Sequence, residues 1–357
     1  MSRKLISATL VLLLFVSTAM GQEENNKKRY KRAKNIILMI GDGMSATQIY
    51  AGLTAKKAPL HLERVKFIGF SKTNSTRYVT DSGAGATAFA TGHKTYNGAI
   101  SVDSTGKTVP TILEIAEQHG LSTGLVATTD ITDATPASFT AHQPSRKLQQ
   151  EIAAEFLNSG VDVFIGAGYE HFTQRKDGKD LTADLKEKGY QVSTDIDEIT
   201  GFTTGKVAGF LKEKPFSERG DQLSRTALSA INILKQNKNG FFLMVEGSKI
   251  DDGGHGNNLN VVLDEMIDFD NAIGKVLEFA EKDGNTLVII TGDHETGGLT
   301  LTGGNITTGE VEGRFSTKGH TGVMIPVFAF GPGAEAFAGI YHNNFIFYKM
   351  MSAFRFN

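Results

Sequence analysis

Short apolar runs recur along the chain at intervals that leave room for a helix between them. They are rich in Ile, Val, Leu and Phe at every position, as strands buried on both faces of a sheet need to be. These runs occupy residues 35–40, 123–127, 161–165, 241–245, 286–290 and 324–328. The pattern predicts six buried strands of a parallel sheet.

Amphipathic segments lie between several of these runs, at residues 110–119, 146–158 and 259–282. Gly120, Gly160 and Gly284 follow them at or near their ends, as residues that stop helices do. Alternating strands and helices predict an α/β fold, a three-layer sandwich with a central, mostly parallel sheet covered by helices on both faces. In such folds ligands bind at the carboxyl ends of the strands.

The first residues have the pattern of a secretory signal peptide. Arg3 and Lys4 precede an apolar run at 5–16, and small residues follow up to Gly21. The run is shorter than the roughly 20 residues that span a bilayer. We therefore expect a signal peptide at 1–21, a flexible lead-in at 22–34 and a single domain at 35–357. The mature protein would be exported, to the periplasm or the medium, with no stable membrane anchor.

Composition narrows the chemistry. The 357 residues include 37 basic and 39 acidic side chains, a net charge of −2, which gives no overall attraction to nucleic acid. There is no cysteine, so disulfides, thiolate metal ligands and cysteine nucleophiles are excluded. Any metal ligands must come from histidine and oxygen donors.

Acidic and imidazole side chains stand next to the ends of these runs. They are Asp42, Glu246, Asp251, His255, Asp293, His294 and His320. Because the carboxyl ends of parallel strands meet at one edge of the sheet, these groups are expected to converge. Oxygen and nitrogen donors without sulfur predict a site for zinc with a harder companion such as magnesium.

The other histidines are interpreted as surface or structural residues, except that His142 is left open. Those given the structural interpretation are His61, His93, His119, His171 and His342.

Ser82 is the candidate nucleophile. The small residues after it are typical of a tightly packed first helical turn, which would put its hydroxyl at a positive helix terminus. No histidine stands beside it in sequence, and a metal ion could instead stabilise the deprotonated hydroxyl. The alternative is an ordinary N-cap serine.

Six stretches of this sequence resemble the alkaline phosphatases, in their order and near their spacing. The resemblance runs from about Lys34 to near the C-terminus and rests on IGDGM, VTDSGAGATAFATGHKTYNGAISVD, DATPASFTAHQPSRK, FFLMVEGSKIDDGGH, TLVIITGDHE and KGHTG. It implies a periplasmic or secreted phosphomonoesterase that acts on small organic phosphate monoesters and carries two zinc ions and one magnesium ion.

The resemblance also implies roles for individual residues. Ser82 would be the nucleophile that becomes phosphorylated, Arg146 would grip two phosphate oxygens, and Asp81 would orient Arg146. The implied metal ligands are Asp251, His255 and His320 for the first zinc, Asp42, Asp293 and His294 for the second, which also meets Ser82, and Asp42, Thr135 and Glu246 for magnesium.

Two departures from the family pattern leave questions open. Asp252 and Asp133 make the surroundings of the magnesium site more acidic, so the metal preferred there is open. Only 25 residues separate His294 from His320, where many relatives insert a subdomain that helps to build the dimer, so a homodimer is an open possibility. The alternative functions are a phosphodiesterase or sulfatase-like hydrolase on the same metal plan and, less favoured, a non-catalytic metal- or phosphate-binding protein.

Overall fold

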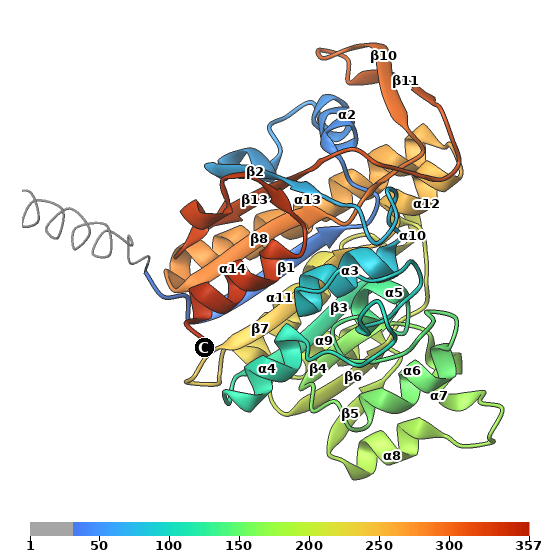
Figure 1. Ribbon diagram of the computed structural model, residues 1–357, viewed down its shortest axis with the longest axis vertical. Helices are drawn as coiled ribbons and strands as arrows, with labels where there is room; N and C mark the ends of the chain where they lie inside the picture. The colour runs from blue at the N-terminus through green and yellow to red at the C-terminus, as the bar shows by residue number, and fades with distance from the viewer. Residues whose placement is uncertain (1–30, 357) are drawn as a thin grey trace, which may run out of the picture. The chain divides into compact units, whose positions relative to one another are not determined.

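The structure, a computed structural model, describes residues 31–356 of the chain (Figure 1). The expected signal peptide at 1–21 and residues 22–30 of the expected lead-in lie outside the described residues. Within the unit that begins at Arg32, Ala33 is buried and donates its N–H to Ala353 O at 3.0 Å. None of the helices in the described part is both long and apolar enough to cross a membrane.

A ten-stranded sheet forms the middle of the molecule (Figure 1). Its order is β14-β2-β13-β8-β1-β7-β3-β4-β6-β5, and every strand except β13 runs in the same direction. The expected α/β sandwich is confirmed. The strands are β1 (Asn35–Gly41), β2 (Phe67–Lys72), β3 (Ser122–Asp130), β4 (Val163–Ala167), β5 (Tyr190–Ser193), β6 (Lys206–Phe210), β7 (Phe241–Gly247), β8 (Thr286–Gly292), β13 (Ile325–Phe330) and β14 (Gly339–His342).

The six runs predicted from the sequence correspond to β1, β3, β4, β7, β8 and β13. The prediction that the last of them is parallel is wrong, because β13 pairs antiparallel with both β8 and β2. No helix lies between β8 and β13, and a parallel neighbour needs a crossover that is usually helical. The sequence pattern did not predict four strands, β2, β5, β6 and β14. Two of them, β2 and β14, lie at one edge of the sheet, where apolar side chains are exposed and form no continuous buried run.

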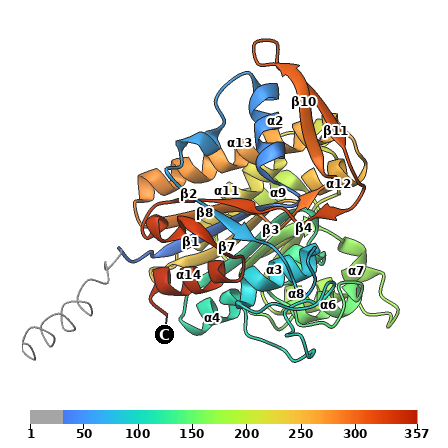
Figure 2. The same ribbon diagram turned by 45° about the horizontal axis from the view of Figure 1, so that its top comes forward.

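Helices cover both faces of the sheet (Figure 2). Along β1, Ile36, Leu38 and Ile40 join the core on one face, while Ile37 and Met39 join the core on the other. The first face is covered by α3 (Ser82–Thr91), α4 (Ile112–Gln118), α6 (Gln149–Phe156), α7 (Tyr169–Thr173), α8 (Leu181–Glu187) and α14 (Phe345–Phe354). The second is covered by η1 (His61–Arg64), α9 (Ile196–Gly201), α11 (Gln222–Leu234) and α13 (Leu259–Asp283). The remaining helices are α2 (Ala46–Lys56), α5 (Ala134–Ala137), α10 (Phe216–Arg219), α12 (Ile250–His255) and η2 (Ala334–Phe337).

A hairpin of β10 (Leu299–Asn305) and β11 (Glu310–Phe315) projects beside α2, at the top of Figures 1 and 2. At its base, β9 (Glu295–Thr296) pairs antiparallel with β12 (His320–Thr321). This short pairing returns the chain to the end of β8 and brings His320 to the same place as His294.

Candidate active site

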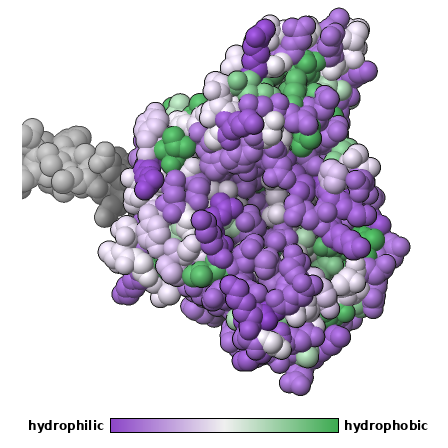
Figure 3. Space-filling view, turned by 90° about the vertical axis from the view of Figure 1, so that its right-hand side faces the viewer, coloured by the Kyte–Doolittle hydropathy of each residue, from purple (hydrophilic) through white to green (hydrophobic). Residues whose placement is uncertain are grey.

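Most of the predicted metal ligands lie at or after the ends of four adjacent strands, β8, β1, β7 and β3, while Ser82 begins α3 and His320 belongs to β12. Gly41 at the end of β1 pairs in register with Gly247 of β7 and Gly292 of β8. Asp42 and Asp293 therefore leave the sheet at the same level. Figure 3 faces this edge of the molecule and shows a mostly hydrophilic surface.

Asp251, His255 and His320 come together at this edge. The Nε2 atom of His255 lies 3.2 Å from Asp251 Oδ2, and that of His320 lies 3.6 Å from Asp251 Oδ1. The two Nε2 atoms are only 3.2 Å apart. On the other side of each ring, Nδ1 donates to a carbonyl, that of Lys318 at 2.5 Å and that of Thr80 at 3.0 Å. When both rings are neutral, their Nε2 lone pairs face each other, an arrangement that suits a shared cation.

Asp42, Asp293 and His294 form a second group directly beside the first. His294 Nε2 lies 3.2 Å from Asp293 Oδ2 and 3.5 Å from Asp42 Oδ1. The other oxygen of Asp293 accepts the N–H of Gly43 at 3.2 Å. Gly43 has a φ of +73°, and a side chain there would meet the backbone of Asp251 at 2.9 Å, so the glycine allows the two groups to approach each other.

The third predicted set, Asp42, Thr135 and Glu246, supplies buried oxygen atoms that have no partner. Within the described part of the chain, Asp42 Oδ1, Thr135 Oγ1 and both carboxylate oxygens of Glu246 make no hydrogen bond. Unpaired buried carboxylates are costly, and native proteins pair them or use them to hold metal ions. These atoms are the hard oxygen donors that magnesium prefers.

Burial shifts the acid-base behaviour of this edge. It raises the pKa of Asp42 well above its usual value, and the negative charge of Asp293 adds to the shift. Burial also raises the pKa of Asp293 to about 7 and lowers the pKa of His294. Divalent cations would offset these costs, because they stabilise the carboxylates and bind a neutral imidazole. The residues present therefore fit metal ions bound by oxygen and nitrogen.

Ser82 is the first residue of α3 and is buried. Its Oγ lies 3.3 Å from His294 Nε2. Asp81 is the N-cap of the helix, with its side chain accepting the N–H of Ala84 at 3.0 Å. The alternative interpretation of Ser82 as an N-cap serine is thus wrong, and its hydroxyl faces the second group instead of capping the helix.

Arg146 lies between two carboxylates. Its Nη2 donates to Asp133 Oδ1 at 3.1 Å and Oδ2 at 3.3 Å, and its Nη1 is 3.6 Å from Asp81 Oδ2. The sequence interpretation named Asp81 as the orienting partner, and the structure adds Asp133 as the nearer one. Although burial opposes it, the charges of Asp133 and Asp81 raise the pKa of Arg146, so the guanidinium stays charged.

A comparison with known protein families shows to which family the chain belongs. The family model described as alkaline phosphatase matches residues 33–314, which is most of the chain. The chain belongs to the alkaline phosphatase family. Membership makes it a hydrolase of the phosphomonoesterase class.

Individual alkaline phosphatases support the same assignment. The chain is 33% identical to alkaline phosphatase 3 of Bacillus subtilis, with 98% of this chain and 96% of that protein covered. It is 32% identical to the alkaline phosphatase of Escherichia coli, covering 90% and 86%. The alkaline phosphatase of the Antarctic bacterium TAB5 superposes with a TM-score of 0.86 at 44% identity, over 92% of this chain and 99% of that one. A variant of the TAB5 enzyme was solved with Mg bound in its M3 site.

Thr296 is a residue of the candidate site that the sequence did not reveal. Its hydroxyl donates to Asp251 Oδ1 and lies 3.2 Å from His294 Nδ1. It therefore links the two groups and fixes the orientation of the His294 ring. Its place two residues after His294 is the only sequence signal. His142, left open above, contacts Ser101 O and Glu114 Oε1, both at 2.9 Å, and belongs to neither group.

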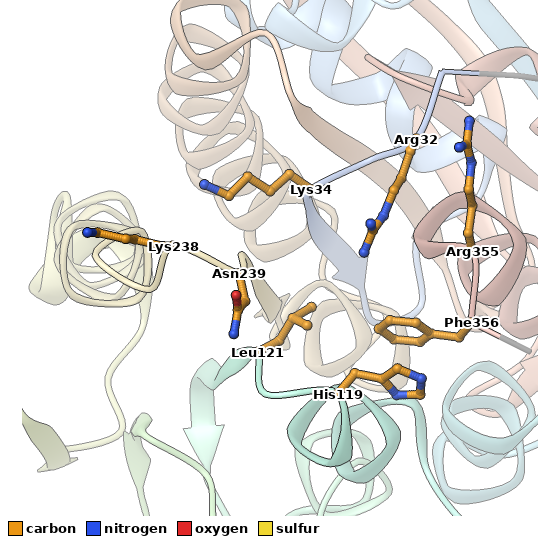
Figure 4. Close-up of a pocket in the computed structure, with 8 residues that line it drawn as sticks. All are labelled: Arg32, Lys34, His119, Leu121, Lys238, Asn239, Arg355 and Phe356. Atoms are coloured by element: carbon orange, nitrogen blue, oxygen red, sulfur yellow. The ribbon is translucent and has the colours of Figure 1, made fainter.

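A second, basic pocket of 490 Å³ lies at the opposite edge of the sheet (Figure 4). Lys34, Leu121 and Asn239 line it just before β1, β3 and β7 begin. The ring of His119 stacks on Phe356 at 3.8 Å, with Arg32 directed toward them. Among the residues that the structure describes, no carboxylate lines this pocket, so this lining lacks the acidic ligands that mark the carboxyl edge. The carboxyl edge is therefore the candidate active site.

Proposed function

We propose that this enzyme hydrolyses small organic phosphate monoesters through a phosphorylated Ser82, at a centre of two zinc ions and one magnesium ion. The observation that carries the proposal is the position of Ser82. Its Oγ lies 3.3 Å from His294 Nε2, one residue after an aspartate that faces Arg146. Nearby, Asp42 Oδ1 and both carboxylate oxygens of Glu246 accept no hydrogen bond from the described residues.

The proposed ligands follow the three groups of side chains. Bound cations would neutralise the carboxylates and stabilise both the deprotonated oxygen of Ser82 and the departing alcohol oxygen. The first zinc is assigned to Asp251, His255 and His320, the second to Asp42, Asp293 and His294, and magnesium to Asp42, Thr135 and Glu246.

The residues of the chain perform two displacements. The guanidinium of Arg146 binds two oxygens of the phosphate dianion, and Asp133 and Asp81 hold it in place. Ser82 Oγ attacks phosphorus, a new P–O bond forms, and the bond to the alcohol breaks. Water then attacks the phosphoserine and releases inorganic phosphate, which restores the serine. Positioning and charge neutralisation supply most of the catalysis, since phosphoryl transfer needs little covalent help.

The test is phosphate release from an aryl phosphate monoester at alkaline pH. We expect turnover in the metal-loaded protein, its loss on chelation and its return when zinc and magnesium are restored. Ser82→Ala should give no labelled phosphoenzyme and at least a thousandfold lower kcat, the scale seen when a covalent nucleophile is lost. A labelled adduct that persists in this variant would refute the role of Ser82.

Aryl phosphodiester and aryl sulfate substrates separate the proposal from its alternatives. Faster turnover of either than of the monoester would replace the proposal by a diesterase or a sulfatase. No turnover of any ester in the metal-loaded protein would point to a binding protein.

We also propose that residues 35–357 form one catalytic domain, supported by ligands that come from both ends of this span. Export is proposed from the motif at residues 1–21. Light scattering of the metal-loaded enzyme distinguishes a monomer from a homodimer.

A further inference from the structure

A third group of possible metal ligands lies outside the active site. Asp130 ends β3, and Glu170 and His171 belong to α7, which follows β4. One ligand atom from each of the three side chains lies within 4.8 Å of the others. Asp130 pairs in register with Ala167 at the end of β4. The group therefore sits at the same edge of the sheet as the active site, at the ends of β3 and its neighbour β4.

The contacts within the group are close. His171 Nε2 lies 3.2 Å from Asp130 Oδ2, and the two side chains are only 17% and 20% exposed. Glu170 is exposed, so an ion can reach the group from solvent. Gly168, with a φ of +85°, lies against both inner residues, and a Cβ there would be 3.0 Å from Asp130 Cβ and 3.3 Å from His171 Cδ2.

No cationic side chain neutralises the two acids. Among the described residues, no lysine or arginine forms an ion pair with Asp130 or Glu170. Arg175, four residues after His171, is directed elsewhere, since it pairs with Asp177 at 2.8 Å and donates to the carbonyl oxygens of Gln150 and His171. The group thus offers two carboxylates and one imidazole with a net negative charge.

We propose that Asp130, Glu170 and His171 bind one divalent transition metal ion of the zinc class, in addition to the ions of the active site. Carboxylate oxygen and imidazole nitrogen are ordinary zinc ligands, and three protein ligands leave a position for water. This assigns a ligand role to His171, which the sequence interpretation took as structural.

The site connects to the phosphate-binding residues through one turn of chain. Asp133 N–H donates to Asp130 O at 2.9 Å, and the side chain of Asp133 holds Arg146. A metal ion on Asp130 would steady this turn and, through it, the guanidinium. Asp130 is a positioning residue in this respect, so filling the site should lower KM for the monoester and leave kcat nearly unchanged.

The test counts zinc in the full-length metal-loaded enzyme after equilibrium dialysis against zinc and magnesium. Wild type, His171→Ala and Glu170→Gln are compared with His93→Ala. His93 is exposed and belongs neither to the active-site ligands nor to the group of Asp130, Glu170 and His171. We expect His171→Ala to hold one zinc equivalent fewer than wild type, and His93→Ala to hold the same number. Because the result is a difference between variants, it is independent of how many ions the active site retains.

Glu170→Gln guards against a folding artefact, since this side chain is exposed and its replacement should leave the fold intact. The substitution should weaken zinc binding by Asp130, Glu170 and His171 at least tenfold. A second readout is the NMR signal of the His171 ring, which should shift when cobalt(II) is added to enzyme whose active site is already filled with zinc. Equal zinc content in wild type, His171→Ala and Glu170→Gln, or an unshifted His171 signal, would overturn the proposal and leave a plain hydrogen bond between His171 and Asp130.

Discussion

The buried carboxylates around Arg219 and those around Asp42 differ in where their positive charge comes from. On α10, Arg219 donates to Glu265 at 3.0 Å and to Asp268 at 2.6 Å on α13, and all three side chains are at most 3% exposed. Near Asp42, by contrast, neither carboxylate oxygen of Glu246 accepts a hydrogen bond within the described part of the chain, and Asp42 Oδ1 accepts none either.

The difference distinguishes a structural cluster from a binding cluster. Both are formed by burying acids, which burial alone would protonate. In the first cluster each carboxylate accepts a hydrogen bond from the guanidinium, so the cluster needs no ligand. Carboxylates that receive no hydrogen bond from a cationic side chain are complete only when a ligand supplies charge. Arg146 is intermediate between the two clusters. Its guanidinium contacts Asp133 and Asp81 but remains partly exposed.

The largest expected effect breaks the structural cluster. Arg219→Met should lower the free energy of unfolding by about 3–5 kcal/mol, because it leaves Glu265 and Asp268 buried without a counter-charge. Turnover per folded molecule should change less than threefold. Denaturant unfolding of the metal-loaded enzyme measures the first quantity. Arg225→Met is the control, since its pairing with Asp197 is exposed and should contribute less than about 1 kcal/mol. A loss for Arg219→Met as small as the control's would contradict the comparison.

The next effect concerns the arginine of the binding cluster. Arg146→Ala should weaken inhibition by inorganic phosphate by about 1.5–3 kcal/mol, the range for a lost charged hydrogen bond, with little change in the unfolding free energy. Arg146→Lys should recover only part of the affinity, because an ammonium group cannot bind two oxygens in one plane. Inhibition constants at fixed pH give the measurement, and unchanged inhibition in Arg146→Ala would remove this residue from phosphate binding.

The smallest expected effect concerns Glu117, a carboxylate that neither pairs with an arginine nor belongs to a proposed metal site. Burial raises the pKa of Glu117 to about 7 from its ordinary 4.5, and the charge of Asp162 contributes. The folded protein thus holds this proton more tightly than the unfolded chain does. The resulting stabilisation is complete below about pH 4.5 and is lost as the pH rises through about 7.

Glu117→Gln should abolish that pH dependence, while its amide oxygen can still accept the hydroxyl of Thr123. We expect the variant to gain on the order of 1 kcal/mol over wild type between pH 5 and pH 8, a value reduced for solvent screening of a partly exposed group. Unfolding curves of both proteins at the two pH values provide the check. A stability difference that stays constant with pH would show that Glu117 is already ionised at pH 5.

The sequence predicted which candidate residues come together where their chemistry and the sheet topology coincide. Asp42 and Asp293 directly follow apolar runs, so their convergence follows from parallel pairing alone. Ser82 could be placed at a helix start because small residues crowd after it. These features depend on short stretches of chain, and the structure brings the predicted residues together as the strand order requires.

What the sequence could not predict depends on pairings between distant segments. The reversed direction of β13 follows from the β9–β12 pairing, and each of those strands is two residues long, too short to show a pattern. The nearness of Asp133 to Arg146 and the bridge made by Thr296 depend on side-chain placement that periodicity does not encode.

The hairpin of β10 and β11 separates His294 from His320 along the chain, while the β9–β12 pairing at its base holds them together in space. The length of the hairpin is therefore independent of the geometry of the site. Its turn, where Ile306 is exposed, is a natural place to insert a peptide tag or a small folded domain without disturbing the catalytic residues. Ile306 lies twelve residues after His294 and fourteen before His320, so an inserted domain would be attached near the candidate site in sequence but outside the part of the chain that orders it.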